Sequence, residues 1–276
     1  MLYPGLYEQV INNALNRELA EIPEARKSTA PIDTAEAAKV LAQYLTDVVQ
    51  KGLENVQDNG GGIEAQIQLA NQIVTTIQNT TQEADFAALG VDQRAEQLLA
   101  LLQQNDPRLA TGKSAKDLDR PETSIAQSSL FTGAIHEPQM YTELKKEIVS
   151  ADRIDMLVSF IKWSGLRLIM DELRQFAQNG GELRIITTSY MGATDVKAIE
   201  ELRALPNTKI KVSYDTKRTR LHAKTYVFYR YTGFTTAYVG SSNLSNAAIS
   251  SGLEWNVKVT RKDLPETIEK IAATFE

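Results

Sequence analysis

The chain has 276 residues, of which 42% are hydrophobic and 24% charged, as in a soluble globular protein long enough for two domains. It has no cysteine, which excludes disulfides, zinc–thiolate sites and thiol nucleophiles and suits a reducing cytoplasm. The net charge of −5 is unevenly distributed, because residues 1–118 hold 9 basic and 16 acidic groups whereas residues 119–276 hold 21 and 19.

The start of the chain and its apolar runs carry no membrane signal. The first residues lack the basic-then-apolar order of a signal peptide. The longest apolar runs are far shorter than the ~20 residues that a membrane helix needs. We therefore expect a cytoplasmic protein with no membrane partner.

The first part of the chain has only helical periodicity. Apolar residues recur at helical spacing over residues 7–19, 33–54, 63–78 and 91–104. A polar, turn-rich stretch follows at residues 109–127. Residues 1–118 are predicted to be an all-α N-terminal domain with its linker, and nothing in them suggests chemistry.

From residue 128 onward, helical and strand patterns alternate. Helices are predicted over residues 139–151, 165–181, 194–206 and 264–276, and strands over residues 153–161, 182–190, 209–215, 220–230, 235–240 and 253–260. Such alternation favours an α/β domain over residues 119–276, with a central, mostly parallel sheet between helices.

Basic residues cluster in one part of this second domain. Residues 209–230 carry a single acid, Asp215, and seven bases: Lys209, Lys211, Lys217, Arg218, Arg220, Lys224 and Arg230. In an acidic chain such a cluster indicates a polyanion-binding site, although a solvated loop explains the charges equally well.

The segment "RLHAKTYVFYR", residues 220–230, holds one of the two histidines. In a strand, successive side chains alternate faces, so His222 and Lys224 point to the same side with Tyr226 and Phe228. An imidazole can attack phosphorus while an ammonium neutralises the oxyanion charge. A histidine buried in a core strand is the alternative, but a buried lysine beside it is costly without a partner.

Two further segments offer groups for an anion. Residues 240–243, "GSSN", form a predicted strand-to-helix turn whose backbone N–H groups and amide can bind an anion, and Glu254 opens the next strand. Lys162 and Trp163 follow a predicted strand, at the edge where open α/β sheets bind ligands. Packing of Trp163 in the core, with Lys162 facing solvent, is the alternative.

"HAK" followed by "GSSN" resembles the HKD motif of the phospholipase D superfamily, H-x-K-x4-D with G-S-x-N downstream. With "GLEWNV", residues 126–260 are similar to metal-independent phospholipase D-type restriction endonucleases. The resemblance implies a phospholipase D-like mixed sheet between helices, preceded by the all-α domain, and no metal or cofactor. It implies four catalytic residues: His222, Lys224, Asn243 and Glu254. The expected substrate-binding residues are Ser241, Ser242, Lys162, Trp163, Lys217, Arg218 and Arg220.

The sequence departs from this motif at one position, where Tyr229 stands in place of the aspartate. Tyr229 is seven residues from His222, so in a regular strand its side chain leaves on the opposite face. We therefore expect position 229 to be structural and Glu254 to orient the histidine. A degenerate site is the other interpretation of the substitution.

In the resembling superfamily, one histidine attacks phosphorus and a second protonates the leaving oxygen, so two motifs are required. This chain has one. His136 lacks a lysine two residues on and is predicted to lie in a surface loop. The second half-site is therefore expected from a second copy, in a homodimer that shares one active site.

The order of parts also resembles the N-terminal portion of bacterial superfamily 2 helicases with a nuclease-like domain, so that a helicase motor would follow residue 276. We expect a metal-independent phosphodiesterase that cleaves DNA through a phosphohistidine intermediate, with RNA as the alternative polymer. A catalytically degenerate DNA-binding module of the same fold is one alternative. A phospholipase or phosphatidyltransferase is another, although such enzymes commonly carry both motifs in one chain.

Overall fold

The computed structural model describes residues 2–104, 106–134, 136–215, 221–248 and 254–275. The chain divides into two compact units, Met1–Leu99 and Ala100–Glu276. No helix in the described ranges is long and apolar enough to cross a membrane.

The N-terminal unit is helical, as predicted. Its helices are α1 (Asn13–Ala20), α2 (Ala37–Asp58) and α3 (Ile63–Thr81), with short 3₁₀ turns η1 (Glu24–Arg26) and η2 (Ala84–Leu89). Asn12 caps α1 by accepting hydrogen bonds at Oδ1 from the backbone N–H groups of Ala14 and Leu15. Among its described residues only Ile67 is a buried hydrophobic, so this unit has a small core.

The predicted helix over residues 91–104 is wrong, because the structure has no helix there. Leu98 and Leu101, which were to form its apolar stripe, are both 83% exposed. A short amphipathic helix gains most of its stability by packing its apolar face, and these leucines have no such packing.

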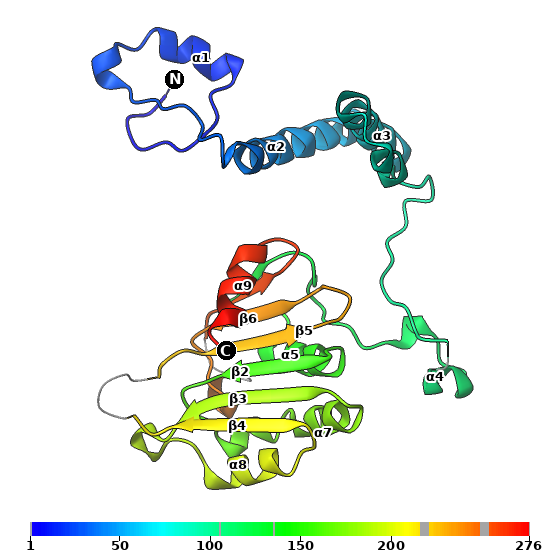
Figure 1. Cartoon of the computed structure of the whole chain (residues 1–276), viewed down its shortest axis with the longest axis vertical. Helices are drawn as coiled ribbons and strands as arrows, with labels where there is room; N and C mark the ends of the chain where they lie inside the picture. The colour runs from blue at the N-terminus through cyan, green and yellow to red at the C-terminus, as the bar shows by residue number, and fades with distance from the viewer. Residues whose placement is uncertain (1, 105, 135, 216–220, 249–253, 276) are drawn as a thin grey trace. The chain divides into compact units, whose positions relative to one another are not determined.

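The C-terminal unit is built on a seven-stranded sheet of order β1-β7-β6-β5-β2-β3-β4 (Figure 1). The strands are β1 (Ser129–Phe131), β2 (Arg153–Leu157), β3 (Glu182–Thr188), β4 (Thr208–Ser213), β5 (Thr225–Tyr229), β6 (Thr236–Gly240) and β7 (Asn256–Thr260). The helices are α4 (Pro107–Ala110), α5 (Met140–Val149), α6 (Trp163–Leu166), α7 (Met170–Gln178), α8 (Val196–Arg203) and α9 (Pro265–Ala273), and the 3₁₀ turns η3 (Ala115–Asp117) and η4 (Tyr190–Gly192).

The sheet is mixed, as the resemblance implied, and the prediction of a mostly parallel sheet is wrong. Only the β2–β3 and β3–β4 pairs are parallel, whereas β1–β7, β7–β6, β6–β5 and β5–β2 are antiparallel. Parallel neighbours need a crossover connection, which the helices after β2 and β3 supply. The β5–β6 connection is too short for a crossover.

The two faces of the sheet are covered unequally. Helices α5, α7 and α8 pack on one face through the larger core, with Leu144, Leu173 and Leu202 among its fully buried residues. On the other face, α9 contributes Ile268 to a smaller cluster with Val227, Ala237 and Val259. Figure 1 shows α9 in front of the sheet. We call this second side the α9 face.

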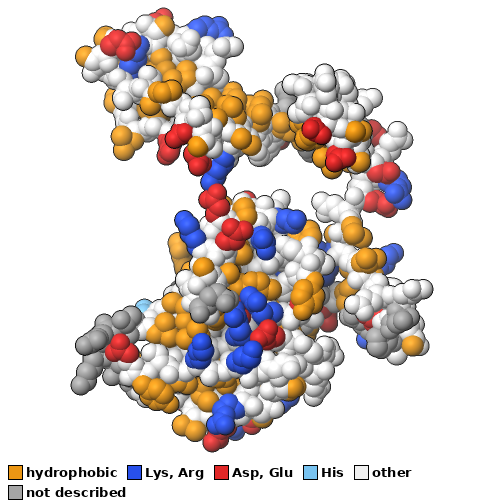
Figure 2. All heavy atoms as spheres, in the orientation of Figure 1, with side chains coloured by type: hydrophobic (Ala, Val, Ile, Leu, Met, Phe, Trp, Pro, Cys, Tyr) orange, Lys and Arg blue, Asp and Glu red, His pale blue; other side chains and the backbone are white. Residues whose placement is uncertain are grey.

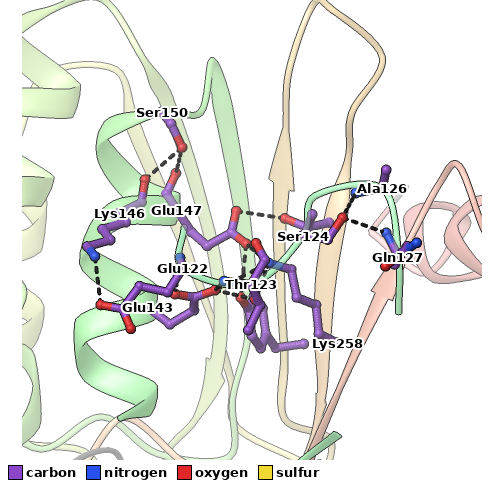
Figure 3. A network of polar contacts seen from close by, with 12 residues as sticks. Glu122, Thr123, Ser124, Ala126, Gln127, Glu143, Lys146, Glu147, Ser150 and Lys258 are labelled. Atoms are coloured by element: carbon purple, nitrogen blue, oxygen red, sulfur yellow. Dashed lines mark hydrogen bonds and ion pairs between the residues drawn. The ribbon is translucent and has the colours of Figure 1, made fainter. Parts of the chain in front are cut away.

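A buried polar network joins α5 to the sheet and to the segment before β1 (Figure 3). Glu147, which is fully buried, pairs with Lys258 at 2.9 Å and with Arg230 at 2.5 Å, and accepts a hydrogen bond from Tyr238 Oη at 2.9 Å. Although burial alone would raise it, the cations Arg230 and Lys258 hold the pKa of Glu147 below its usual value.

Glu143, one turn earlier on α5, extends the network to the linker. It accepts backbone N–H bonds from Glu122 at 2.8 Å and Thr123 at 2.9 Å, together with the hydroxyl of Thr123 (Figure 3). Residues 122–123, predicted to be part of a polar, turn-rich linker, are therefore fixed within the C-terminal unit by a fully buried carboxylate.

Candidate active site

The predicted catalytic residues lie around one edge of the sheet. Strand β2 ends at Leu157, which pairs with the first residue of β5, Thr225. Strand β6 ends at Gly240, which pairs with the first residue of β7, Asn256. We call this edge, where β2 and β6 end and β5 and β7 begin, the site edge.

His222 and Lys224 lie just before β5, because the strand begins at Thr225 rather than at residue 220. The Lys224 ammonium is 3.1 Å from both ring nitrogens of His222 and donates to the His222 carbonyl oxygen at 2.7 Å. Lys224 is only 6% exposed, whereas the histidine is exposed. The pair therefore presents an accessible imidazole backed by a buried positive charge.

Glu254 acts on Lys224 through its charge. Desolvation lowers the pKa of Lys224, and the negative charge of Glu254 partly offsets that effect. The carboxylate also adds to the effect of burial in raising the pKa of Tyr226. Among the described residues Glu254 makes no hydrogen bond to the His222 ring, so its predicted orienting role stays a prediction.

The turn after β6 can only be formed with glycine at its start. A Cβ on Gly240 would lie 2.1 Å from the Trp255 carbonyl oxygen, which is closer than any real contact. The backbone N–H of Gly240 donates to the Lys224 carbonyl oxygen at 3.2 Å, and the backbone N–H of Ser241 donates to the Trp255 carbonyl oxygen at 3.1 Å. These bonds hold the start of the turn beside Lys224.

Asn243 joins this turn to the end of β2. Its Oδ1 accepts hydrogen bonds from the backbone N–H groups of Ser159 at 3.1 Å and Phe160 at 3.3 Å. With the oxygen held by backbone, Nδ2 is the part of the amide that can donate to an anion. The buried hydroxyl of Ser159, beside this amide, has no hydrogen-bond partner among the described residues.

The serines of the turn differ in exposure. Ser241 is exposed, and its Oγ accepts a hydrogen bond from Trp255 N–H at 3.2 Å. Ser242 is fully buried, and its Oγ accepts from Asn256 Nδ2 at 2.7 Å and donates to the Ala248 carbonyl oxygen at 3.3 Å. Its predicted binding role stays a prediction.

Sequence reasoning missed the positioning roles of Asn256 and Tyr226, which both donate hydrogen bonds to Ser242. The Asn256 amide donates to the Ser242 hydroxyl, and Tyr226 Oη donates to the Ser242 carbonyl oxygen at 3.0 Å. An asparagine inside the strand predicted over residues 253–260 is the signal that could have identified the first of these.

Lys162 and Trp163 lie on the same edge but have partners within the protein. Lys162 pairs with Asp195 at 3.1 Å, and the Trp163 backbone N–H donates to the same carboxylate at 2.8 Å. These two contacts lower the pKa of Asp195. The Trp163 ring packs against the core, with the Lys197 ammonium 4.5 Å from its centroid. Their predicted substrate-binding roles stay predictions.

Tyr229 lies on the face opposite the larger core, as the odd spacing predicted. Tyr226 and Phe228 belong to the larger core, whereas Tyr229 packs against the cluster under α9. The Arg153 guanidinium stacks 3.8 Å from its ring centroid. The residue at the motif's aspartate position therefore serves packing on the α9 face.

Four further residues were considered from the sequence: His136, Lys217, Arg218 and Arg220. His136 is exposed, as expected of a loop residue. Lys217, Arg218 and Arg220 lie outside the described residues. In the described ranges, no three His, Asp or Glu side chains converge as metal ligands would.

Comparison with known proteins places this domain in a family. Residues 144–276 match the family model described as cardiolipin synthase, PLD-like domain. NucT from Helicobacter pylori is 22% identical, covering 54% of this chain and 92% of its own, with a TM-score of 0.43. Nuc from Salmonella typhimurium, a phospholipase D family member, is 22% identical, and the match covers 54% of this chain and 91% of Nuc, with a TM-score of 0.40. Yeast tyrosyl-DNA phosphodiesterase is 12% identical, and the match covers 48% of this chain and 31% of the yeast chain, with a TM-score of 0.32. No curated protein matches the chain.

Proposed function

Residues 144–276 belong to the phospholipase D superfamily, and on that premise we propose that the chain is a metal-independent phosphodiesterase that cleaves DNA through a phosphohistidine at His222. One observation supports this most directly: a buried Lys224 ammonium lies 3.1 Å from both nitrogens of an exposed imidazole. A buried charge is costly, and it is retained here where phosphate charge needs neutralising.

In the first step, an unprotonated nitrogen of His222 attacks phosphorus and forms a P–N bond as the P–O bond to the leaving strand breaks. Lys224 and the Nδ2 group of Asn243 stabilise the charge that develops on the non-bridging oxygens. In the second step, water attacks the phosphohistidine, the P–N bond breaks, and the imidazole is restored.

A second imidazole has to protonate the leaving oxygen and then deprotonate the water. His136 is the other histidine of the chain and lacks the lysine two residues on. His222 of a second copy supplies that group in the proposal, so the working enzyme is a homodimer with one shared site. The sequence resemblance to helicase-associated domains further suggests a nuclease module within a larger restriction or repair protein.

The proposal is tested by nicking of supercoiled plasmid DNA in excess EDTA. Cleavage is expected to persist at an undiminished rate, because the histidine rather than a metal-bound water is the nucleophile. Loss of cleavage in chelator, restored by added Mg²⁺, would contradict it.

The alkaline limb of the pH–rate profile is expected to depend on Glu254. Desolvation lowers the pKa of Lys224 and the Glu254 carboxylate raises it. Substituting Glu254→Gln removes the second effect, so the ammonium is lost at lower pH and the alkaline limb moves to lower pH. Hydrolysis of bis(p-nitrophenyl) phosphate as a function of pH measures this shift. Glu201→Gln, a substitution on α8, is the control and should leave the alkaline limb at its wild-type pH. An alkaline limb at the wild-type pH in Glu254→Gln would argue against the role of this carboxylate.

A DNA-binding module that has lost catalysis is the second candidate, and Tyr229 at the motif's aspartate position is the observation that favours it. Its packing on the α9 face separates it from the site edge. Gel-shift binding without cleavage of either plasmid or small diester by the wild-type chain would favour this candidate.

A further inference from the structure

The two tryptophans of the chain have different surroundings. The Trp163 ring packs against the larger core, with the Lys197 ammonium 4.5 Å from its centroid. Trp255 is 63% exposed and belongs to neither core cluster. Its ring and indole N–H have no hydrogen-bond or cation partner among the described residues. Trp255 therefore presents a free aromatic surface.

The backbone of Trp255 is fixed at the site edge. Strand β6 pairs with β7 as far as Gly240 and Asn256. One position beyond, Ser241 N–H donates to the Trp255 carbonyl oxygen at 3.1 Å, and Trp255 N–H donates to Ser241 Oγ at 3.2 Å. Because β6 lies between β7 and β5, two strand spacings, about 10 Å, separate this backbone from that of Lys224. The indole is thus attached within the reach of a nucleoside whose phosphate lies at His222.

Three further apolar side chains are exposed next to Trp255. Leu130, Val257 and Val239 are direct neighbours across β1, β7 and β6, and they are 44%, 44% and 38% exposed. Val257 is two residues from Val259, which packs beside α9, so this row lies on the α9 face. Figure 2 shows hydrophobic side chains exposed on this face of the C-terminal unit. We call Trp255 and these three residues the apolar patch. A contiguous patch of this kind beside a candidate active site indicates a binding surface.

A nucleobase fits the apolar patch better than a lipid does. A base stacks on an exposed aromatic ring through its flat face and requires no charge from the protein. Surfaces that bind membranes combine exposed apolar side chains with lysines and arginines. Among the residues directly before and after each member of the patch, the one base is Lys258, and its side chain is fully buried.

We infer that Trp255 stacks on the nucleobase next to the phosphate that His222 attacks, and that the substrate strand is unpaired at this position. This inference rests on the proposed function, which places the phosphate at His222 and Lys224. In a duplex both faces of a base are covered by its neighbours, so the indole can stack only on a base of a single strand or on one that has left the helix. The nucleotide is then held at two points, its phosphate and its base.

Strand binding without cleavage tests the inference on the full chain carrying His222→Ala. The ligands are a fluorescein-labelled oligothymidylate and an abasic strand with the same number of phosphates, and fluorescence anisotropy gives both affinities. The oligothymidylate is expected to bind about 5- to 150-fold more tightly, the factor that one base stacked on an aromatic ring contributes. Adding Trp255→Ala should remove most of this preference and leave the affinity for the abasic strand unchanged. Adding Trp255→Phe should keep most of it.

Trp163→Phe is the matched control, because it changes the tryptophan that packs against the core, and it should keep the preference. An undiminished preference in Trp255→Ala would overturn the inference, as would an equal loss of affinity for both strands. Binding to phosphatidylglycerol vesicles that depends on Trp255, without a preference between the strands, would assign the apolar patch to lipid instead.

The same measurements distinguish this inference from the proposed function, because they do not depend on catalysis. If the chain with His222 intact hydrolyses neither the oligothymidylate nor bis(p-nitrophenyl) phosphate, the proposed function is contradicted. A preference for the oligothymidylate that still depends on Trp255 would in that case leave the base-stacking role standing.

Discussion

Replacing His222 with alanine is expected to reduce phosphodiester hydrolysis at least about 10³-fold, because removal of a nucleophile disables both steps of a covalent mechanism. The side chain is exposed, so its loss should leave the fold intact. Hydrolysis of bis(p-nitrophenyl) phosphate in EDTA measures the effect without a requirement for DNA binding.

His136→Ala is the matched control for this substitution, since it removes the other exposed histidine of the chain. Full activity in His136→Ala and its loss in His222→Ala is the expected pair of results. Comparable activity in His222→Ala and the wild type would remove His222 from the mechanism, and the opposite pattern would move the site to His136.

Replacing Glu147 with alanine is expected to destabilise the C-terminal unit by about 3–5 kcal/mol, the cost of leaving buried charges without their partner. Arg230 and Lys258 both pair with this carboxylate, and their side chains are 6% and 0% exposed. Lys258 keeps a longer contact to Glu143 at 3.4 Å, whereas Arg230 keeps only neutral acceptors among the described residues.

Tryptophan fluorescence in urea can follow this unit within the full chain, because both tryptophans, Trp163 and Trp255, belong to it. Glu201→Ala removes a partly exposed ion pair with Arg174 and should cost less than about 1 kcal/mol. An equal cost for Glu147→Ala and Glu201→Ala would refute the structural role of the network.

The folded-state pKa of Glu147 is lowered, so the stabilisation that this carboxylate contributes is present above the ordinary carboxyl pKa. It is lost as the pH falls through the lowered value.

The elements with a strong apolar period could be predicted from the sequence, and those determined by distant contacts could not. Helices α5 and α8 lie within their predicted ranges, because each packs a regular apolar stripe. Strand β1 was not predicted, since its three residues are fixed by pairing with β7, more than 120 residues away. The helix predicted over residues 165–181 is divided into α6 and α7, with Gly165 against the Ser245 backbone.

The candidate site shows the same limit. The spacing of His222 and Lys224 could be recognised locally, although the alternation argument placed them inside a strand that begins only at Thr225. The hydrogen bonds from the Ser159 and Phe160 N–H groups to Asn243 join residues more than 80 positions apart in the sequence. The hydrogen bond from Asn256 to Ser242 depends on the β6–β7 register. Sequence indicated which residues are candidates for chemistry, and tertiary contacts determine how those residues are oriented.

The stereochemical course at phosphorus tests the central claim, a covalent phosphohistidine, most directly. A chiral phosphorothioate diester would be hydrolysed in ¹⁸O-labelled water and the configuration of the product determined. Two successive displacements, first by His222 and then by water, each invert phosphorus, so net retention is the expected result. Net inversion would mean that water attacks the diester directly, and would contradict the account.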